Sequence, residues 1–561
     1  MASPGRSYRM IDQMKEKDFF QQGPVLKNQF TKDPLLARYL KRKMPDGVFA
    51  EISPRLQEMG ELVAGPMLAW ADEAERNPPV HVPYDPWGRR IDEIRVSGAW
   101  KKMEEIAATH GLIAAGYERK FAEFSRLFQM SLLYLYHPSS AIYSCPLAMT
   151  DGATRAIELY GSPEMKARAF KHLTSRDPKQ FWTSGQWMTE KSGGSDVSGA
   201  QTVARRDGSQ YRLHGTKWFT SATTSQMTMT LARPEGAESG SRGLSLFYVE
   251  LRDDQGQLQN IRIHRLKDKL GTKALPTAEL SLEGTPAQVV GGEGNGVRKI
   301  SSLFNITRIY NAICSLGQMR RGIELATEYA SLRTAFGRRL SEHPLHVLTL
   351  SDLQLEWMGC FHLTMKTVEL LGKDECGKAT ETESALLRVL TPLAKLYCGK
   401  ATVSVASEVL ECFGGAGYVE DTGLPKLLRD AQVLAIWEGT TNVLSLDMLR
   451  AFEKEKGFEA IQADLGARLK AIKNPEAQKI LAHALSDLGK NFESAMKAGD
   501  DHVSANARGF SMTLTRIYIG SLLWEFAEST GEAKDRLAAQ QWLLHRSLKI
   551  DLKSLIESNL L

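Results

Sequence analysis

Apolar residues in the first third of the chain recur at intervals of three and four, the periodicity of a helix that is buried on one face. Leu56, Met59 and Val63 form one such stripe. The pattern predicts a mostly helical region over residues 1–180. Several prolines interrupt it between residues 78 and 86, and because proline cannot continue a helix we expect an extended loop there.

Between residues 181 and 290 the period falls towards two, which indicates β-strands. Polar and apolar side chains alternate over residues 211–217, and the runs at 244–249 and 278–282 are typical of further strands. These segments predict a compact β domain.

Helical periodicity returns after the glycine-rich residues 291–296. It continues through long amphipathic segments near 300–330, 345–373 and 382–412, and again over 455–561. The fold class expected from this order is α+β, mainly α. A chain of 561 residues with 42% hydrophobic content can bury a large core and is expected to divide into two to four domains.

The charge balance is mild, with 71 basic and 66 acidic side chains and a net charge of +5. Such a balance does not by itself indicate nucleic acid as a partner. The basic cluster of Arg38, Lys41, Arg42 and Lys43 is interpreted as a solvated helix face, with an anion site as the alternative.

The cysteines are scattered without a CxxC pair: Cys145, Cys314, Cys360, Cys376, Cys398 and Cys412. They indicate neither a disulfide framework nor a metal site, and a reducing compartment fits them. The sequence contains no apolar run long enough to span a bilayer and no hydrophobic signal core. Asp12, Glu16 and Asp18 argue against a transit peptide. We therefore expect a cytoplasmic protein in preference to a mitochondrial one.

One carboxylate is unusually placed: Glu438 follows a tryptophan and precedes a glycine within residues 436–441. Apolar neighbours can partly desolvate such a group, which suits it to take a weakly acidic C–H proton if an electron acceptor lies nearby. The alternative is an ordinary glutamate at a helix start, followed by a turn.

Several other stretches occur in a compatible order, namely MTEKSGGSDV at 188–197, KWFTS at 217–221, RLKDKLG at 265–271 and LPKLLRDAQVLAIWEGTTNVLSLDMLR at 424–450. Together they resemble the acyl-CoA dehydrogenase family of flavoproteins, with the nearest match to its AidB-type branch. The resemblance covers roughly residues 20–455.

The resemblance implies a three-part architecture and an FAD cofactor. The parts would be an N-terminal helical domain at 1–180, a central β-barrel-like domain at 181–290 and a four-helix bundle at 291–454. The β domain would hold the flavin ring and the thioester, and the bundle would carry the catalytic glutamate. Residues 455–561 would form an extra C-terminal helical region.

The resemblance also implies where the flavin ring would lie. Thr189, next to Met188, and Ser221 would hydrogen-bond the ring edge, while Trp218 and Phe219 would form an aromatic wall. Without that context, a Trp-Phe pair on a strand is usually part of a protein core.

Ser195 lies in the glycine-rich loop 193–196, whose small side chains leave room for a ligand. In the family it lies between the flavin pyrophosphate and the acyl-CoA thioester, so we assign it to both cofactor and substrate. An ordinary hairpin turn is the alternative.

The far end of the cofactor is assigned to Arg333, Phe336, Gly414 and Gly415. In the family the arginine reaches the pyrophosphate of an FAD held by a neighbouring subunit, and its guanidinium is a fork of donors suited to phosphate. The resemblance thus implies a homotetramer, a dimer of dimers with shared FAD sites. A helix cap and a helix-end turn are the alternatives. Glu411 replaces a common glutamine before this loop, and a carboxylate donates no hydrogen bond unless protonated.

Near the base, Thr440 and Asn442 occupy positions that touch the phosphate–ribose part of the flavin in this family. Arg308 is expected to open the helix after the β domain and to border the active site or the CoA path, with a helix-start ion pair as the alternative. Gly439 is also assigned to the substrate. The neighbours Arg429 and Asp430 are interpreted as an ion pair that positions the loop around Glu438 (residues 436–441, the base loop), with substrate contact as the alternative.

The reaction implied is oxidation of an acyl-CoA thioester to the trans-2-enoyl-CoA. Glu438 would remove the α proton and flavin N5 would accept the β hydride. The backbone N–H of Glu438 and a ribityl hydroxyl would stabilise negative charge on the thioester oxygen. An electron-transfer flavoprotein is the acceptor implied for the reduced flavin.

Two other functions stay open. The protein could be a flavin-containing protein that binds or sequesters acyl-CoA, or an AidB-like stress-protective protein with weak dehydrogenase activity. DNA binding is disfavoured, because the tail from Glu453 carries acidic and basic residues in nearly equal numbers.

Overall fold

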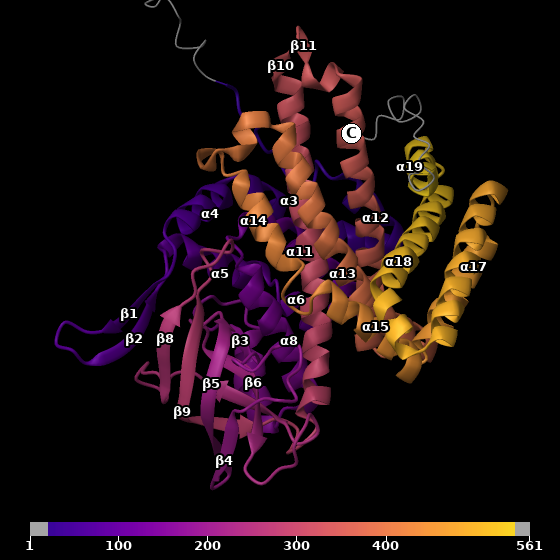
Figure 1. Ribbon diagram of the computed structural model, residues 1–561. Coiled ribbons are helices and arrows are strands. Elements are labelled where there is room, and N and C mark those ends of the chain that lie inside the picture. The colour runs from indigo at the N-terminus through magenta and orange to yellow at the C-terminus, as the bar shows by residue number, and fades with distance from the viewer. Residues whose placement is uncertain (1–20, 545–561) are drawn as a thin grey trace, which may run out of the picture.

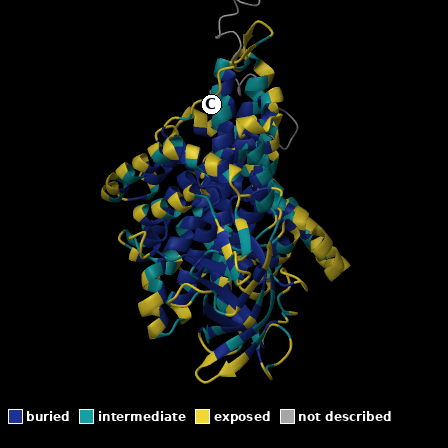
Figure 2. Cartoon of the chain, turned by 90° about the vertical axis from the view of Figure 1, so that its left-hand side faces the viewer, coloured by how far each residue is buried: buried dark blue, intermediate teal, exposed yellow. Residues whose placement is uncertain are grey.

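The computed structural model describes residues 21–544 and has a long helical body with a β domain at one end (Figure 1). The expected fold class, mainly α with a central barrel, a helical bundle and additional C-terminal helices, is confirmed. Asp12, Glu16 and Asp18 lie outside the described residues. Buried residues fill the middle of both the helical body and the barrel (Figure 2).

The N-terminal region is helical, as expected. The first helix of the described residues begins after Asp33, whose carboxylate accepts a hydrogen bond from the backbone N–H of Leu36 (3.0 Å). This N-cap satisfies one free donor of the first turn. The elements are α2 (Pro34–Lys43), α3 (Asp46–Ala64), α4 (Pro66–Arg76), α5 (Gly98–His110), α6 (Ala114–Glu118), η2 (Ala122–Phe124), α7 (Ser125–Tyr136), η3 (His137–Ser139), α8 (Ser144–Tyr160), α9 (Pro163–Met165), η4 (Lys166–Phe170) and α10 (Lys171–Leu173).

The proline-rich segment is a β-hairpin rather than the extended loop that we expected. Its strands β1 (Val80–Tyr84) and β2 (Arg90–Arg95) pair antiparallel, and the hairpin projects from the body (Figure 1). Pro83 is tolerated because the register shifts between Val82 and Tyr84, so no ladder position requires its missing N–H.

The β domain is a closed barrel. Its strands are β3 (Ser184–Trp187), β4 (Val203–Asp207), β5 (Gln210–Ser221), β6 (Met227–Pro234), β7 (Ser245–Glu250), β8 (Ile261–Leu266) and β9 (Thr277–Val289). The sheet runs β3-β6-β4-β5-β9-β7, and pairing of β6 with β7 closes it. Leu213, Phe247 and Leu280 are fully buried in its core. The alternation along β5 is therefore the inside–outside pattern of a barrel strand.

Long helices form the bundle beyond the barrel. They are α11 (Gly296–Leu332), α12 (Pro344–Glu375), α13 (Glu381–Cys412), α14 (Pro425–Leu434) and α15 (Thr441–Lys454), with the small strands β10 (Thr334–Ala335) and β11 (Arg338–Arg339) and the short turns η5 (Leu340–Glu342), η6 (Gly414–Tyr418) and η7 (Glu420–Thr422). Helix α11 starts at Gly296, where a Cβ would lie 2.6 Å from the carbonyl carbon of Ser245. Arg308 is therefore well inside this helix, and the expectation that it opens the helix was wrong.

The C-terminal region packs on the bundle through α18, which contacts α12, α13 and α15 (Figure 1). Its helices are α16 (Gly457–Ala471), α17 (Pro475–Ala498), α18 (Asp500–Thr530) and α19 (Ala533–Leu544). None of the helices within residues 21–544 combines the length and the apolar character that a bilayer span requires.

The basic cluster on α2 is only in part the solvated face that we expected: Lys41 and Arg42 are exposed, whereas Arg38 and Lys43 form ion pairs. The Arg38 guanidinium forms a two-point ion pair with the buried carboxylate of Asp535 (2.7 and 3.0 Å), and Lys43 lies 3.3 Å from Glu369. The Arg42 guanidinium donates to the carbonyl of Ser529. These side chains fasten the first helix to the C-terminal region and to α12.

A buried polar network joins the N-terminal helices to the bundle. The Arg126 guanidinium pairs with Asp151 (2.9 Å) and with Glu375 (2.6 Å). The Asp151 carboxylate also accepts hydrogen bonds from the hydroxyls of Tyr117 (2.7 Å) and Tyr310 (2.8 Å). A buried ion pair is tolerated only when its remaining donors and acceptors are satisfied, and this network meets that condition.

We predict that Asp151→Asn destabilises the protein strongly, because it leaves the buried Arg126 without one of its two carboxylates. The free energy of unfolding should fall by about 3–5 kcal/mol, measured from guanidinium chloride unfolding curves. Asp72→Asn breaks a solvent-exposed pair with Arg76 and should change it by no more than about 1 kcal/mol. Equal effects of the two variants would contradict a structural role for the network.

Candidate active site

Glu438 lies in the turn between α14 and α15, and its backbone is left-handed with φ +57°. Gly439 follows with φ +100°, a value that glycine adopts at little cost. A non-glycine residue in the left-handed region costs roughly 1–2 kcal/mol. Other contacts must therefore hold this turn, and it presents a carboxylate from a loop rather than from a helix start.

The carboxylate and carbonyl of Glu438 are held by α11. The Thr307 hydroxyl donates to carboxylate oxygen Oε2 (2.6 Å), and the Arg308 guanidinium reaches the Glu438 carbonyl (3.4 Å). Arg308 is itself paired with Asp447 (2.7 Å), a residue of α15. Arg308 thus lies beside the loop that carries Glu438. It also forms an ion pair inside the protein, which was the alternative interpretation of this residue.

A buried lysine also reaches this loop, and sequence reasoning missed it. The Lys395 ammonium, on α13, donates to the carbonyl of Gly439 (2.5 Å), and its residue is 1% exposed. Burial lowers the pKa of Lys395 to about 7, with Glu438 opposing and Arg308 reinforcing the shift. The available signal was one charged residue among apolar neighbours in Leu393–Tyr397, all of them buried.

The predicted flavin-ring residues meet at the ends of two barrel strands. Met188 and Thr189 follow β3, and the backbone N–H of Trp218 on β5 donates to the Thr189 carbonyl (2.9 Å). Phe219 is 51% exposed although it is a large aromatic residue. Ser221, at the end of β5, lies 3.1 Å from the Thr277 hydroxyl. Two separate motifs thus form one edge with the exposed ring of Phe219, the partly exposed ring of Trp218 and hydroxyl groups.

A buried ion pair locks these two strand ends together. The Lys217 ammonium donates to the Glu190 carboxylate (2.8 Å) and to the Leu231 carbonyl (3.0 Å). Burial raises the pKa of Glu190, but Lys217 and hydrogen bonds from Thr202 and Gln201 outweigh it, so the net pKa is lowered. Glu190 directly follows Thr189 in the sequence, and Lys217 directly precedes Trp218, so this ion pair connects two predicted flavin contacts.

Lys267 is a further cation at this edge that the sequence did not single out. Its ammonium lies 4.0 Å from the ring centre of Trp218 and 4.4 Å from that of Phe219, and it pairs with Glu279 (2.8 Å). A cation over an aromatic face stabilises the ring in that orientation. Ser195, in contrast, is in an exposed loop, where a bridge between Glu190 and Gly193 closes the turn.

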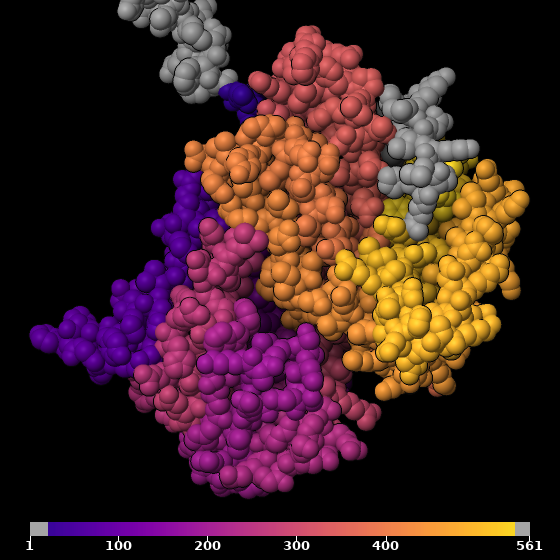
Figure 3. Space-filling view, in the orientation of Figure 1, coloured from indigo at the N-terminus to yellow at the C-terminus, as the bar shows by residue number. Residues whose placement is uncertain are grey.

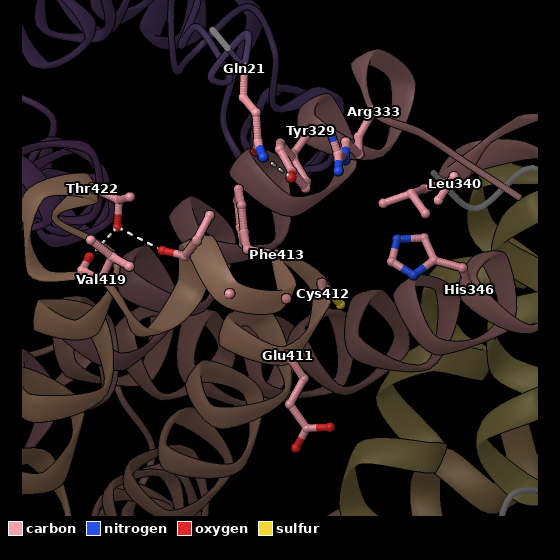
Figure 4. A pocket seen from close by; sticks show the side chains of 14 residues that line it. Gln21, Tyr329, Arg333, Leu340, His346, Glu411, Cys412, Phe413, Val419 and Thr422 are labelled. Carbon is pink, nitrogen blue, oxygen red and sulfur yellow. Dashed lines mark hydrogen bonds between the residues drawn. The ribbon is translucent and has the colours of Figure 1, made fainter. Parts of the chain in front are cut away.

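Four of the predicted cofactor residues, Arg333, Phe336, Gly414 and Gly415, lie at the other end of the bundle. Arg333, Gly414 and Gly415 line one cavity of about 650 Å³, and Figure 4 shows Arg333 and His346 on the same side of it. Phe336 is 96% exposed at the tip and does not line the cavity. Among the described residues no group pairs with the buried Nε2 of His346, and burial together with His343 lowers its pKa. The cavity therefore offers a cation and an unpartnered imidazole to a ligand.

These two groups of residues are far apart within one chain. Helix α11 carries Thr307 beside the base and is followed at once by Arg333, and the helical rise of about 1.5 Å per residue separates them by about 39 Å. An extended dinucleotide is shorter than that. The barrel that carries the ring residues contacts the start of α11 through β7, whereas Arg333, Gly414 and Gly415 lie together beyond the end of this helix. The structure therefore does not bring the two groups together within one chain.

Thr440 and Asn442 lie at the start of α15, next to the base loop. Thr440 is the N-cap residue and its side chain makes no capping hydrogen bond, so its hydroxyl is available. The Asn442 amide oxygen accepts a hydrogen bond from Arg508 of α18 (3.3 Å). The C-terminal region thus reaches a predicted cofactor residue, which local sequence patterns do not indicate.

Arg429 and Asp430 do not form the ion pair that we expected. Arg429 pairs with Glu420 and lies 3.7 Å from Glu75. Asp430 accepts a hydrogen bond from the backbone N–H of Thr272 (2.6 Å). Adjacent helical residues point in different directions, and here Asp430 connects α14 to the loop before β9.

The surface is hollowed where the magenta β domain meets the orange helices (Figure 3).

Family models match the chain over most of its length. They are the acyl-CoA dehydrogenase middle domain (residues 185–285) and C-terminal domain (294–452), the adaptive response protein AidB N-terminal domain (22–178), and the acyl-CoA dehydrogenase 11 C-terminal domain-like model (449–558).

Individual relatives agree. Acyl-CoA dehydrogenase family member 11 of Caenorhabditis elegans is 43% identical over 92% of this chain and 87% of its own length. The putative acyl-CoA dehydrogenase AidB of Escherichia coli (strain K12) is 34% identical over 68% and 71%. The crystal structure of C. elegans ACDH-11 in complex with C11-CoA superposes with a TM-score of 0.92 at 40% identity, covering 98% of this chain and 97% of that one.

We predict that Lys217→Met lowers the free energy of unfolding, and that the size of this decrease depends on pH. The folded-state pKa of Glu190 is depressed below its ordinary 4.5, so the pair's stabilisation is complete above that pH and is lost as the pH falls through the lower folded value. The free energy of unfolding of the variant should be about 3–5 kcal/mol lower than that of the parent at pH 7. This difference should become smaller below pH 4.5.

Guanidinium chloride unfolding at several pH values measures this difference. Lys102→Met, which removes an exposed pair with Glu105, is the control and should show little change at any pH. A difference for Lys217→Met that grows as the pH is lowered would refute the prediction.

Proposed function

The chain belongs to the acyl-CoA dehydrogenase family, and from this premise we propose that it oxidises an acyl-CoA thioester to the trans-2-enoyl-CoA with FAD as cofactor. The family makes the protein an oxidoreductase. The observation that carries the finer proposal is the Glu438 carboxylate, presented on a left-handed turn and fixed by Thr307. The C11-CoA in the C. elegans relative supports an acyl-CoA as substrate.

The side chains present fit FAD at both ends of the cofactor. At the barrel, the half-exposed Phe219 beside Trp218 and the hydroxyls of Thr189 and Ser221 match the flat, polar-edged flavin ring. At the far end of α11, Arg333 beside an unpartnered imidazole matches a pyrophosphate. When bound, FAD supplies the acceptor for the β hydride.

Glu438 accepts the α proton in this proposal. The proton is weakly acidic, so negative charge on the thioester oxygen needs fixed donors. Among residues 21–544 no group accepts a hydrogen bond from the backbone N–H of Glu438, which leaves that N–H free for the thioester. The carboxylate and this N–H belong to one residue, so a single rigid turn would orient both toward the substrate.

We further propose that the FAD site is completed by a second copy of the chain within a homotetramer. The distance of about 39 Å along α11 between Thr307 and Arg333 prevents one cofactor from touching both residues of one chain. Arg333 from a partner subunit would then bind the pyrophosphate. By the same family resemblance, an electron-transfer flavoprotein would be the partner protein that accepts the electrons of the oxidation.

We predict that Glu438→Gln keeps its yellow FAD but loses reactivity. Anaerobic mixing with an acyl-CoA should reduce the flavin about 10²–10⁴-fold more slowly than in the parent, because the amide cannot accept the proton. Glu459→Gln, an exposed glutamate on α16, is the matched control and should react at the parent rate. Parent-like flavin bleaching by the Glu438 variant would exclude this residue as the base.

We predict that Arg333→Met binds FAD at least about tenfold more weakly, since a charge-assisted hydrogen bond contributes roughly 1.5–3 kcal/mol. Equilibrium titration of the apoprotein with FAD measures the affinity. Arg338→Met, at the same exposed tip, is the control and should leave FAD binding unchanged.

Mixed oligomers test whether the site is shared. Co-expression of differently tagged Arg333→Met and Glu438→Gln chains, purified through both tags, gives particles in which a shared site can combine two parent residues. Recovery of flavin reduction in these particles supports sharing, whereas uniformly inactive particles show that each chain builds its own site.

A further inference from the structure

Two cationic side chains, from two different helices, donate hydrogen bonds to backbone carbonyls of the base loop. Arg308 of α11 reaches the Glu438 carbonyl at 3.4 Å, and Lys395 of α13 reaches the Gly439 carbonyl at 2.5 Å. Arg308 also has a carboxylate partner, Asp447, which it shares with Arg388. Within residues 21–544 Lys395 has no carboxylate in an ion pair with it, and the negative charge that favours its protonated form is that of Glu438.

Burying the charge of Lys395 destabilises the fold unless the residue has a further role. A buried ammonium loses its hydration and must be compensated by hydrogen bonds or by a counter-charge. Among the described residues, the Gly439 carbonyl is the single acceptor within hydrogen-bond distance of the Lys395 ammonium. The residues around Lys395 in sequence, including Leu393 and Leu396, are apolar and fully buried, so an uncharged side chain would suit the packing of α13 better.

The carbonyl that accepts the hydrogen bond from Lys395 belongs to the left-handed turn at Glu438 and Gly439. Glu438 and Gly439 both have positive φ, and a loop without regular hydrogen bonds can relax into other backbone conformations. A fixed Gly439 carbonyl removes that freedom, because rotation of the peptide after Gly439 would break the bond. The orientation of the preceding Glu438 residue is then fixed as well.

We propose that Lys395 is a positioning residue of the dehydrogenation: its buried ammonium holds the Gly439 carbonyl and thereby keeps the Glu438 carboxylate and backbone N–H in the geometry that proton transfer needs. This inference rests on the proposed function. Lys395 acts through the loop and does not itself receive the proton. The expected signature is a slower chemical step with cofactor and substrate affinities little changed.

The test compares Lys395→Met with the parent and with Lys400→Met, a partly exposed lysine on the same helix. Methionine keeps an unbranched side chain, one atom shorter than that of lysine, and removes the charge and the hydrogen-bond donor. Purified holoproteins are mixed anaerobically with an acyl-CoA series, and the limiting rate of flavin reduction is expressed per bound FAD. We expect a decrease of at least about tenfold, which corresponds to about 1.4 kcal/mol in the barrier, with less than threefold change in the acyl-CoA concentration for half-maximal rate.

A second readout is independent of activity. Hydrogen–deuterium exchange of the holoproteins, followed by peptide mass spectrometry, should show faster exchange over residues 435–442 in Lys395→Met and parent-like exchange in the barrel. Lys400→Met should match the parent in both measurements. Lys395→Gln, which retains an amide donor and is less apolar, provides a second variant if the methionine variant does not accumulate as folded protein.

The outcomes separate the inference from the proposed function. A parent protein whose flavin is not reduced by any acyl-CoA overturns the proposed function and this inference with it. Normal reduction of the parent together with an unchanged rate per bound FAD in a folded Lys395 variant overturns the inference alone. A slower rate with local loosening of residues 435–442 supports it.

Discussion

The left-handed turn at Glu438 and Gly439 is the feature on which the active site depends. Two consecutive residues with positive φ do not hold themselves, since such conformations are costly for a residue with a side chain. Contacts from the long helices α11 and α13 and from α15 supply what the turn lacks. The bundle therefore serves as a rigid clamp around a short loop, and the loop carries the reactive carboxylate.

The length of α11 imposes a second constraint. One end of this helix lies beside the base, and the other leads into the cavity that contains Arg333 and the glycines of η6. A straight helix cannot bring its own two ends to one cofactor. Chemistry near the barrel and binding at the far tip are therefore separated within a chain, which is a physical reason for two chains to cooperate.

Local motifs made part of this site predictable from sequence. Glu438, the Thr189 and Trp218 strand ends and the glycine turn at 414–415 each lie in a short segment with a distinctive composition, and the change of hydrophobic period located the barrel between two helical regions. The structure confirmed the fold class, while the roles of these site residues stay predictions.

Contacts between distant segments were not predictable in the same way. Thr307 and Lys395 reach the base loop from two different helices, and Arg508 reaches the start of α15 from a third. The sequence around each of these residues does not indicate its partner. Arg38 in the basic cluster on α2 misled us for the same reason, because its partner Asp535 lies near the other end of the chain. Arg429 and Asp430 misled us in the opposite sense, since neighbours in sequence were assumed to be neighbours in space.

A crystal structure of the protein with FAD and a bound acyl-CoA tests the central claim most directly. The account predicts electron density for the substrate α carbon between the Glu438 carboxylate and the flavin ring, with Arg333 of another subunit at the pyrophosphate. A Glu438 side chain directed away from the acyl chain, or a cofactor bound elsewhere in the fold, would contradict it.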